Sequence, residues 1–181
     1  MKPRLSYETK SAAYHESGHC IAALILQQDF RGVTIKQRKR SWGKLIGYKH
    51  GSPLARAIVY FTGPLAQSKM MKQNIIFCGN DYYLNCGGGA DFNGACTNLN
   101  WIYNTLNNAH EPYNSCRRKL YLSVLDVSKE IVNANQEQTE LLAKELLKED
   151  TIWYSDIITL LIKNKMWDSL VVPKMPSFER V

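Results

Sequence analysis

The stretch Tyr14–Cys20, which reads Tyr-His-Glu-Ser-Gly-His-Cys, decides how this chain folds. His15 and His19 are four residues apart, so on an α-helix both imidazoles lie on one face and can bind the same metal ion. Glu16 follows about 100° further round the turn, where its carboxylate can reach a water on the metal without being a ligand. This H-E-x-x-H pattern predicts a metallopeptidase-type zinc site with Glu16 as the general base.

Alanine and leucine, which are strong helix formers, surround the motif. They are Ala12, Ala13, Ala22, Ala23, Leu24 and Leu26. We therefore expect a first helix that begins after Ser6 or Thr9, either of which can cap it, and runs to about Phe30. Gly32 is expected to end the helix.

Two short β-leaning runs come next, Val33–Lys36 and Leu45–Tyr48. Between them lies Arg38–Gly43, the strongest charge cluster in the chain. The pattern predicts a β-hairpin with a basic loop. The loop is either a solvated turn or a contact for nucleic acid or an acidic peptide.

Apolar residues at helical spacing predict a second helix from Pro53 to Met71, packed against the first. Asn74–Phe92 reads instead as a loop, and its glycine run would let the backbone approach another group closely. No Gly-Lys-Ser/Thr follows these glycines, which argues against a phosphate-binding loop. A third helix is expected through Ala95–Leu106, with Asp91 in or just before its first turn, where the helix dipole favours a carboxylate.

Three further apolar stripes predict that the remainder is helical. They are Leu120, Val124, Val127 and Ile131; Leu141, Leu142, Leu146 and Leu147; and Ile157, Leu160 and Leu161. Pro173 and Pro176 mark an irregular tail. We therefore expect one mainly α domain with a small β-hairpin, an α+β fold, over residues 1–172, and a tail at 173–181.

Length and composition fit a single globular domain, with 181 residues of which 45% are hydrophobic and 22% charged. The net charge of +7 favours acidic partners or surfaces. No apolar run approaches the roughly 18 residues of a membrane span. The charged start, residues 1–10, has no apolar region of the signal-peptide kind, so we expect a cytoplasmic protein.

The five cysteines argue against a disulfide framework and against a cysteine-ligated zinc, because their number is odd and none form a C-x-x-C pair. They fit a reducing compartment. Cys20 stands beside His19, which makes a Cys/His nucleophile pair conceivable. Its place on the motif helix predicts instead that Cys20 packs as a small hydrophobe.

The H-E-x-x-H motif does not name a third metal ligand. The longer H-E-x-x-H-x-x-G-x-x-H form is excluded, because Ala22 and Ile25 stand where it requires glycine and histidine. Five later residues remain as candidates for the third ligand. They are Asp81, Asp91, His110, Glu111 and Asp126. We expect Asp126 to occupy an exposed position on its helix.

Several segments agree, in their order along the chain, with one known family. They are Ala13–His19, the hairpin Val33–Tyr48, Phe61–Ala66, Gly89–Asp91 with Ala95 four residues later, and Glu149–Ile152. Together they resemble the peptidase domain of the FtsH-type ATP-dependent zinc metalloproteases, from about residue 11 to residue 161. The resemblance implies Zn²⁺ as the metal and His15, His19 and Asp91 as its ligands. It also implies Glu16 as the base.

The chain departs from that family in two respects. The family joins this domain to an AAA ATPase and usually to a membrane anchor, whereas this chain has neither a phosphate-binding loop nor a span. Gln67 stands where the family commonly has glutamate, which removes a carboxylate that would orient a metal ligand.

We therefore expect a zinc metalloendopeptidase that hydrolyses unfolded or partner-delivered polypeptides and uses no ATP itself. A separate ATPase, or self-association of the chain, would then deliver the polypeptide substrates. The alternatives are a catalytically weak or inactive regulator or adaptor of the same fold, and a basic nucleic-acid-binding domain.

Overall fold

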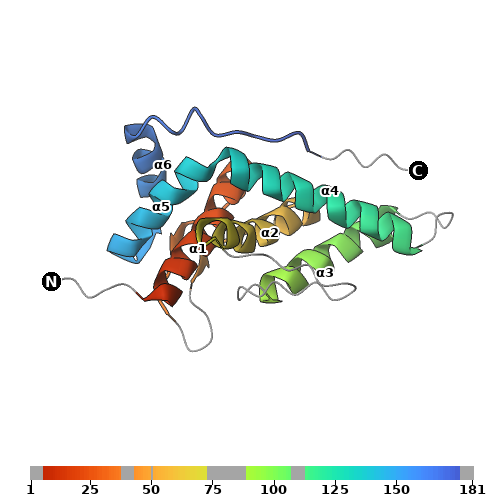
Figure 1. The fold of residues 1–181 in the computed structure, drawn as a ribbon. Coiled ribbons are helices and arrows are strands. Elements are labelled where there is room, and N and C mark those ends of the chain that lie inside the picture. Colours follow the sequence, from red (N-terminus) through yellow and green to blue (C-terminus); the bar gives the residue numbers. More distant parts are fainter. Residues whose placement is uncertain (1–5, 38–42, 50, 73–88, 107–112, 176–181) are drawn as a thin grey trace.

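The computed structural model describes residues 6–37, 43–49, 51–72, 89–106 and 113–175. In chain order its elements are α1 (Tyr7–Ile25), β1 (Gly32–Thr34), β2 (Lys44–Ile46), α2 (Pro53–Met70), α3 (Gly89–Leu106), α4 (Tyr113–Ala134), α5 (Gln136–Glu149), β3 (Thr151–Trp153) and α6 (Tyr154–Lys163). This mainly helical arrangement with a small antiparallel sheet is the fold class that the sequence predicted (Figure 1). None of the helices in these ranges is long and apolar enough to cross a membrane.

The start of α1 agrees with the prediction. Ser6 caps the helix, because its hydroxyl oxygen accepts a hydrogen bond of 3.1 Å from the Thr9 N–H. Small residues then fill the middle of the helix, and its residues from Glu16 to Ile25 are buried. The motif helix is therefore a central element of the core.

The end of α1 differs from the prediction. The helix ends at Ile25, so the expected end near Phe30 was wrong. Gln27 adopts the left-handed conformation with φ 52°, and the N–H groups of Gln27 and Gln28 bond back to carbonyls of the last turn. Glycine usually holds such a position, so a glutamine there gave no visible stop in the sequence.

The second helix, α2, occupies the predicted range and packs across α1. Ser52 caps it and Pro53 fills its first turn. The two helices meet at Gly18, where an added methyl group would lie 2.5 Å from Ala66 Cβ and 2.6 Å from the Thr62 carbonyl oxygen. Only glycine allows this approach, and it brings the histidine face of α1 onto α2.

The predicted hairpin is present as β1 and β2, and a third strand, β3, pairs with the other side of β1. The Thr34 and Thr151 hydroxyls, 2.7 Å apart, join β1 to β3. The expectation that this part of the chain is all helical was wrong for β3, a strand of 3 residues set between two helices. Asp150, with φ 55°, ends α5 immediately before it. Residues 38–42 of the predicted basic loop lie outside the described ranges.

The third helix, α3, begins at Gly89, so the loop predicted for Asn74–Phe92 was wrong for its last four residues. Residues 73–88 lie outside the described ranges. Asp91 lies in the first turn of α3, as predicted. Gly94 lets α3 approach α2, because an added methyl group there would lie 2.8 Å from Cζ of the Tyr60 ring.

The remaining helices, α4, α5 and α6, bury most of the three predicted apolar stripes. The buried members are Leu120, Val124, Val127, Ile131, Leu142, Leu146, Ile157 and Leu161. After α6 the chain runs back alongside α5 and α4 (Figure 1). The buried Asn135 side chain holds it there, because it accepts a hydrogen bond from the Val171 N–H at 2.8 Å and donates one to the Val171 carbonyl at 3.1 Å. Pro173, where we expected the tail to begin, is buried, and residues 176–181 lie outside the described ranges.

Candidate metal centre

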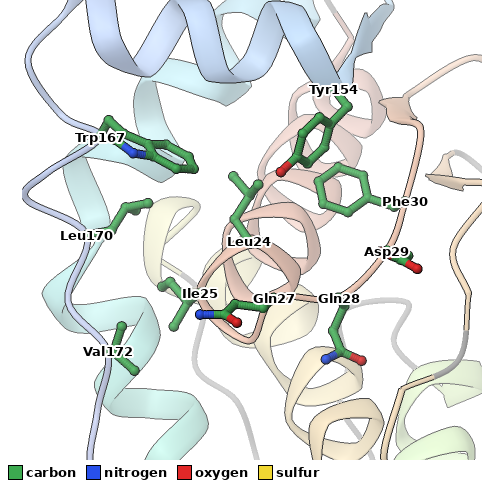
Figure 2. Close-up of a pocket in the computed structure, with 10 residues that line it drawn as sticks. All are labelled: Leu24, Ile25, Gln27, Gln28, Asp29, Phe30, Tyr154, Trp167, Leu170 and Val172. Carbon is green, nitrogen blue, oxygen red and sulfur yellow. The ribbon is translucent and has the colours of Figure 1, made fainter.

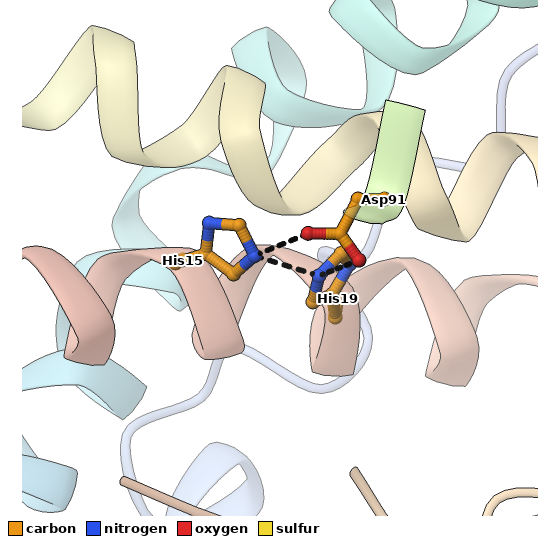
Figure 3. A group of neighbouring side chains, drawn as sticks. All are labelled: His15, His19 and Asp91. Carbon is orange, nitrogen blue, oxygen red and sulfur yellow. Dashed lines mark hydrogen bonds and ion pairs between the residues drawn. The ribbon is translucent and has the colours of Figure 1, made fainter. Parts of the chain in front are cut away.

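His15 and His19 lie on the face of α1 that packs against α2, one helical turn apart. Their Nε2 atoms are 3.0 Å from each other, and the planes of the two rings meet at 83°. His19 is buried, with 6% of its surface exposed, and His15 is half-buried. The spacing of the motif therefore directs both Nε2 atoms to one point, as Figure 3 shows.

Asp91 completes this cluster from the first turn of α3. One carboxylate oxygen, Oδ2, lies 2.9 Å from His15 Nε2, and the other, Oδ1, lies 3.6 Å from His19 Nε2. The possible ligand atoms of His15, His19 and Asp91 all lie within 4.8 Å of one another. No other group of three or more histidine, cysteine or carboxylate side chains in the described ranges is arranged to hold a metal ion. The structure thus brings together the three residues that the family resemblance implied.

The opposite nitrogen of each imidazole is held by α2. His19 Nδ1–H donates a hydrogen bond of 2.6 Å to the Val59 carbonyl, and His15 Nδ1–H donates one of 2.9 Å to the Gln67 side-chain oxygen. A carbonyl oxygen can only accept, so the proton of His19 must stand on Nδ1. Both Nε2 atoms then carry lone pairs in the neutral rings, which is the form that binds a metal.

A short stretch in the middle of α2 makes this support possible. Thr62 donates a hydrogen bond of 2.8 Å to the Val59 carbonyl, and a side chain at Gly63 would overlap the His19 ring. Pro64 has no N–H to bond the carbonyl four residues earlier, which loosens the helix there. These roles were not predicted from the sequence. Glycine and proline inside a helical pattern were the sign that could have revealed them, because both weaken a helix.

The cluster brings electron-rich atoms together without a positive charge to stabilise them. Two imidazole lone pairs and a carboxylate face one another at about hydrogen-bond distance, and none of these groups carries a donor when the rings are neutral. Burial lowers the pKa of His19, but the nearby Asp91 carboxylate outweighs this effect and raises the pKa to about 9. Burial likewise raises the pKa of Asp91, and the charge on His19 reverses this and holds the pKa below its ordinary value. Without a metal, therefore, a proton supplies the missing charge.

The geometry also fits a zinc ion in that place. Zinc binds imidazole nitrogen and carboxylate oxygen at about 2.0–2.2 Å, and tetrahedral angles then place neighbouring ligand atoms about 3.3 Å apart. The three separations within the cluster are 2.9, 3.0 and 3.6 Å. Two histidines and one carboxylate leave the fourth position of a tetrahedral zinc for water or substrate.

Glu16 lies beside these residues without joining them. It is 7% exposed, and burial raises the pKa of its carboxyl group above the ordinary value. Its Oε2 atom has no hydrogen-bond partner among the described residues. Gly43, directly before β2, packs on the side chain, since an added methyl group there would lie 2.5 Å from Glu16 Cγ. Glu16 therefore keeps one carboxylate oxygen that forms no hydrogen bond with the described residues.

The other predicted candidates are not in this cluster. Asp126 is exposed on α4, as expected, and pairs with Lys129 at 3.0 Å. Cys20 is fully buried, and burial raises the pKa of its thiol, which agrees with the predicted packing role. Asp81, together with residues 110 and 111, falls outside the described ranges.

A pocket of about 570 Å³ opens at the far end of α1 (Figure 2). Phe30, Tyr154 and Trp167 contribute aromatic walls, and Asp29 is the one carboxylate among the residues that line it. Histidine and cysteine are absent from its lining. The pocket is therefore separate from the metal cluster and lacks the groups for metal chemistry.

What the cluster can do follows from its donor set. It offers two imidazole nitrogens and one carboxylate to a divalent cation, and the buried Glu16 carboxylate lies next to the two histidines in the chain. That combination suits activation of a water molecule for hydrolysis. Neither a protein-family model nor a curated protein matches this chain.

Proposed function

We propose that the protein is a zinc metalloendopeptidase. The observation that carries the proposal is the buried Glu16 carboxylate next to the ligand set His15, His19 and Asp91. Three protein ligands with an open fourth position are typical of catalytic zinc, whereas structural zinc has four protein ligands. The order of motifs that resembles the FtsH-type peptidase domain supports the same activity.

In the proposed reaction each residue has one task. A zinc ion held by His15, His19 and Asp91 would supply a Lewis acid that polarises the scissile carbonyl and lowers the pKa of a water molecule to about 7. Glu16 accepts the proton of that water on a carboxylate oxygen and then gives it to the leaving amine. Its raised pKa suits the first step, because a more basic carboxylate takes the proton more readily.

The sheet offers a place for the substrate. β2 is an edge strand, and Gly43 at its start touches Glu16. An extended polypeptide added to the edge of β2 that no described strand occupies would run past the general base. Strand addition needs an unfolded segment, so we propose unfolded polypeptides as substrates, supplied directly, by a separate ATPase or by a second copy of the chain.

Two cysteines bear on the proposed cytoplasmic location. Cys20 and Cys96 are free thiols in the described part of the chain. Free thiols suit the reducing conditions of the cytoplasm.

The test compares zinc content and hydrolysis of an unfolded, fluorescently labelled protein, with and without a chelator. Glu16→Gln should keep one zinc per chain and lose about 10²–10⁴-fold in rate, because Glu16 moves a proton and makes no metal bond. His15→Ala should lose the zinc itself. Cleavage by Glu16→Gln at the parent's rate would refute the mechanism. Zinc binding by the parent without any chelator-sensitive cleavage would favour the regulator or adaptor alternative.

A further inference from the structure

One face of α2 leads away from the metal cluster. Gln67 and Gly63 on this face contact His15 and His19. At 100° per residue, Tyr60 and Arg56 continue the same stripe towards the start of the helix. The Tyr60 ring lies against Gly94, one turn beyond Asp91 on α3, so the stripe follows the seam between α2 and α3.

Arg56 is the charged residue at the end of this stripe. Its side chain is half-buried, and its Nε atom is enclosed without a hydrogen-bond partner in the described ranges. None of the ion pairs between described residues involves it. A buried guanidinium donor without an acceptor is unfavourable, and a carboxylate is the group whose geometry matches it best.

The β2 strand leads from the general base towards the start of α2, which carries Arg56. Gly43 at one end touches Glu16, and Tyr48 lies beyond the other end. Gly47 and Gly51, which follow β2, pack on the side chains of Arg31 and Gln28 beyond the end of α1. The chain then enters α2 at its cap, Ser52, four residues before Arg56. A polypeptide paired with the free edge of β2 would therefore pass from Glu16 towards Arg56.

The distance along this path can be estimated from helix geometry. Arg56 precedes Gly63, which contacts the His19 ring, by seven residues, or about 10 Å at 1.5 Å per residue. An extended chain advances about 3.3 Å per residue. A substrate chain therefore covers the roughly 10 Å between His19 and Arg56 with about three residues, so Arg56 lies beside the residue about three positions from the cleaved bond.

We infer that Arg56 is a specificity-determining residue that binds a substrate carboxylate about three residues from the cleaved bond, an inference that rests on the proposed peptidase function. The carboxylate is either an acidic side chain or the carboxyl terminus of the polypeptide. Arg56 donates hydrogen bonds to it through the guanidinium and has no part in the proton transfer. A charge-assisted contact of this kind contributes about tenfold to hundredfold in selectivity.

The experiment uses a set of fluorogenic peptides that are otherwise uncharged and identical. In one arm a single glutamate moves through the positions up to three residues on either side of the cleaved bond, each with a glutamine-matched control. In the other arm the peptide ends in a free carboxylate or an amide at the same distances. The arm in which the parent shows at least about tenfold higher kcat/KM identifies the source of the carboxylate.

Arg56→Gln should abolish that preference and leave kcat/KM for the uncharged peptides nearly unchanged. Arg118→Gln, which removes an exposed arginine from α4, is the matched control and should keep the preference. A parent without any preference, or a preference that survives in Arg56→Gln, would overturn the inference.

The same peptides also separate this inference from the peptidase proposal. If the parent cleaves none of them, the peptidase proposal fails, and labelled peptides are then titrated against zinc-loaded Glu16→Gln protein by fluorescence anisotropy. Tighter binding of the carboxylate peptides that disappears when Arg56→Gln is added supports the inference. Equal binding of both members of each matched pair overturns it.

Discussion

At the scale of single residues, the position of one proton decides what the cluster can bind. The Val59 carbonyl fixes the His19 proton on Nδ1 and so leaves the Nε2 lone pair facing Asp91. Gln67 does the same for His15. From the sequence we expected that this glutamine removes a carboxylate from the site. Its side-chain oxygen nevertheless provides the hydrogen-bond acceptor that orients the ring.

The role of Gln67 can be tested by its effect on zinc affinity. Gln67→Leu should weaken zinc binding about 10- to 100-fold, because His15 loses the acceptor that holds its tautomer and orientation. Gln67→Glu should bind zinc at least as tightly as the parent, since a carboxylate accepts the same hydrogen bond and makes the ring more basic. Competition with a chromophoric chelator measures both. Equal affinities of Gln67→Leu and the parent would contradict the role.

A pH dependence of zinc binding follows from the pKa of His19. In the metal-free protein this pKa is raised to about 9, so at neutral pH a proton occupies the place that zinc must take. Binding therefore releases that proton, and zinc affinity should fall about tenfold for each unit of pH decrease below 9. Chelator competition at several pH values between 6.5 and 8.5 checks the slope. An affinity independent of pH over that range would show that His19 binds no metal.

At the scale of elements, the crossing of α1 and α2 positions the cluster. Gly18 lies within the motif, where it is the point of closest approach to Ala66 and the Thr62 carbonyl. The motif helix therefore carries two kinds of information. Its histidines bind the metal, and its glycine sets the distance to the helix that orients them.

The prediction for this crossing concerns stability. Gly18→Ala should destabilise the protein by about 1–3 kcal/mol, because the new methyl group meets backbone and Cβ atoms that cannot move aside easily. Gly89→Ala is the matched control, since nothing lies within 4 Å of an added methyl group there. It should be neutral or slightly stabilising. Urea unfolding of both variants gives the comparison, and equal stabilities would contradict the proposed close contact.

Helices and strands could be predicted where the local sequence determines them, and not where contacts with distant parts of the chain do. The helical stripes and the start of α1 depend on periodicity and a capping serine, which are both local. The end of α1 depends on Gln27 in a left-handed conformation, and β3 depends on pairing with β1. Tertiary contacts select both features, so the residues themselves gave little sign of them.

At the scale of the whole molecule, three separate helices build the site, because α1 and α3 supply the cluster and α2 supplies the acceptors that orient its imidazoles. The spacing of His15 and His19 predicted their proximity directly, because one turn of one helix determines it. Asp91 could be selected among the candidates only through the family resemblance, since its position depends on how α3 packs against α2. The supporting Val59 carbonyl was not predicted, because any backbone carbonyl looks the same in a sequence.

The most direct test of the account is the zinc X-ray absorption spectrum of the protein loaded with one zinc per chain. We expect two imidazole nitrogens and carboxylate oxygen at about 2.0–2.2 Å, with no sulfur in the coordination shell. Replacing Asp91 with alanine should remove the carboxylate contribution or the zinc itself. A zinc–sulfur distance of about 2.3 Å, or a parent spectrum unchanged in Asp91→Ala, would show that zinc binds elsewhere and contradict the central claim.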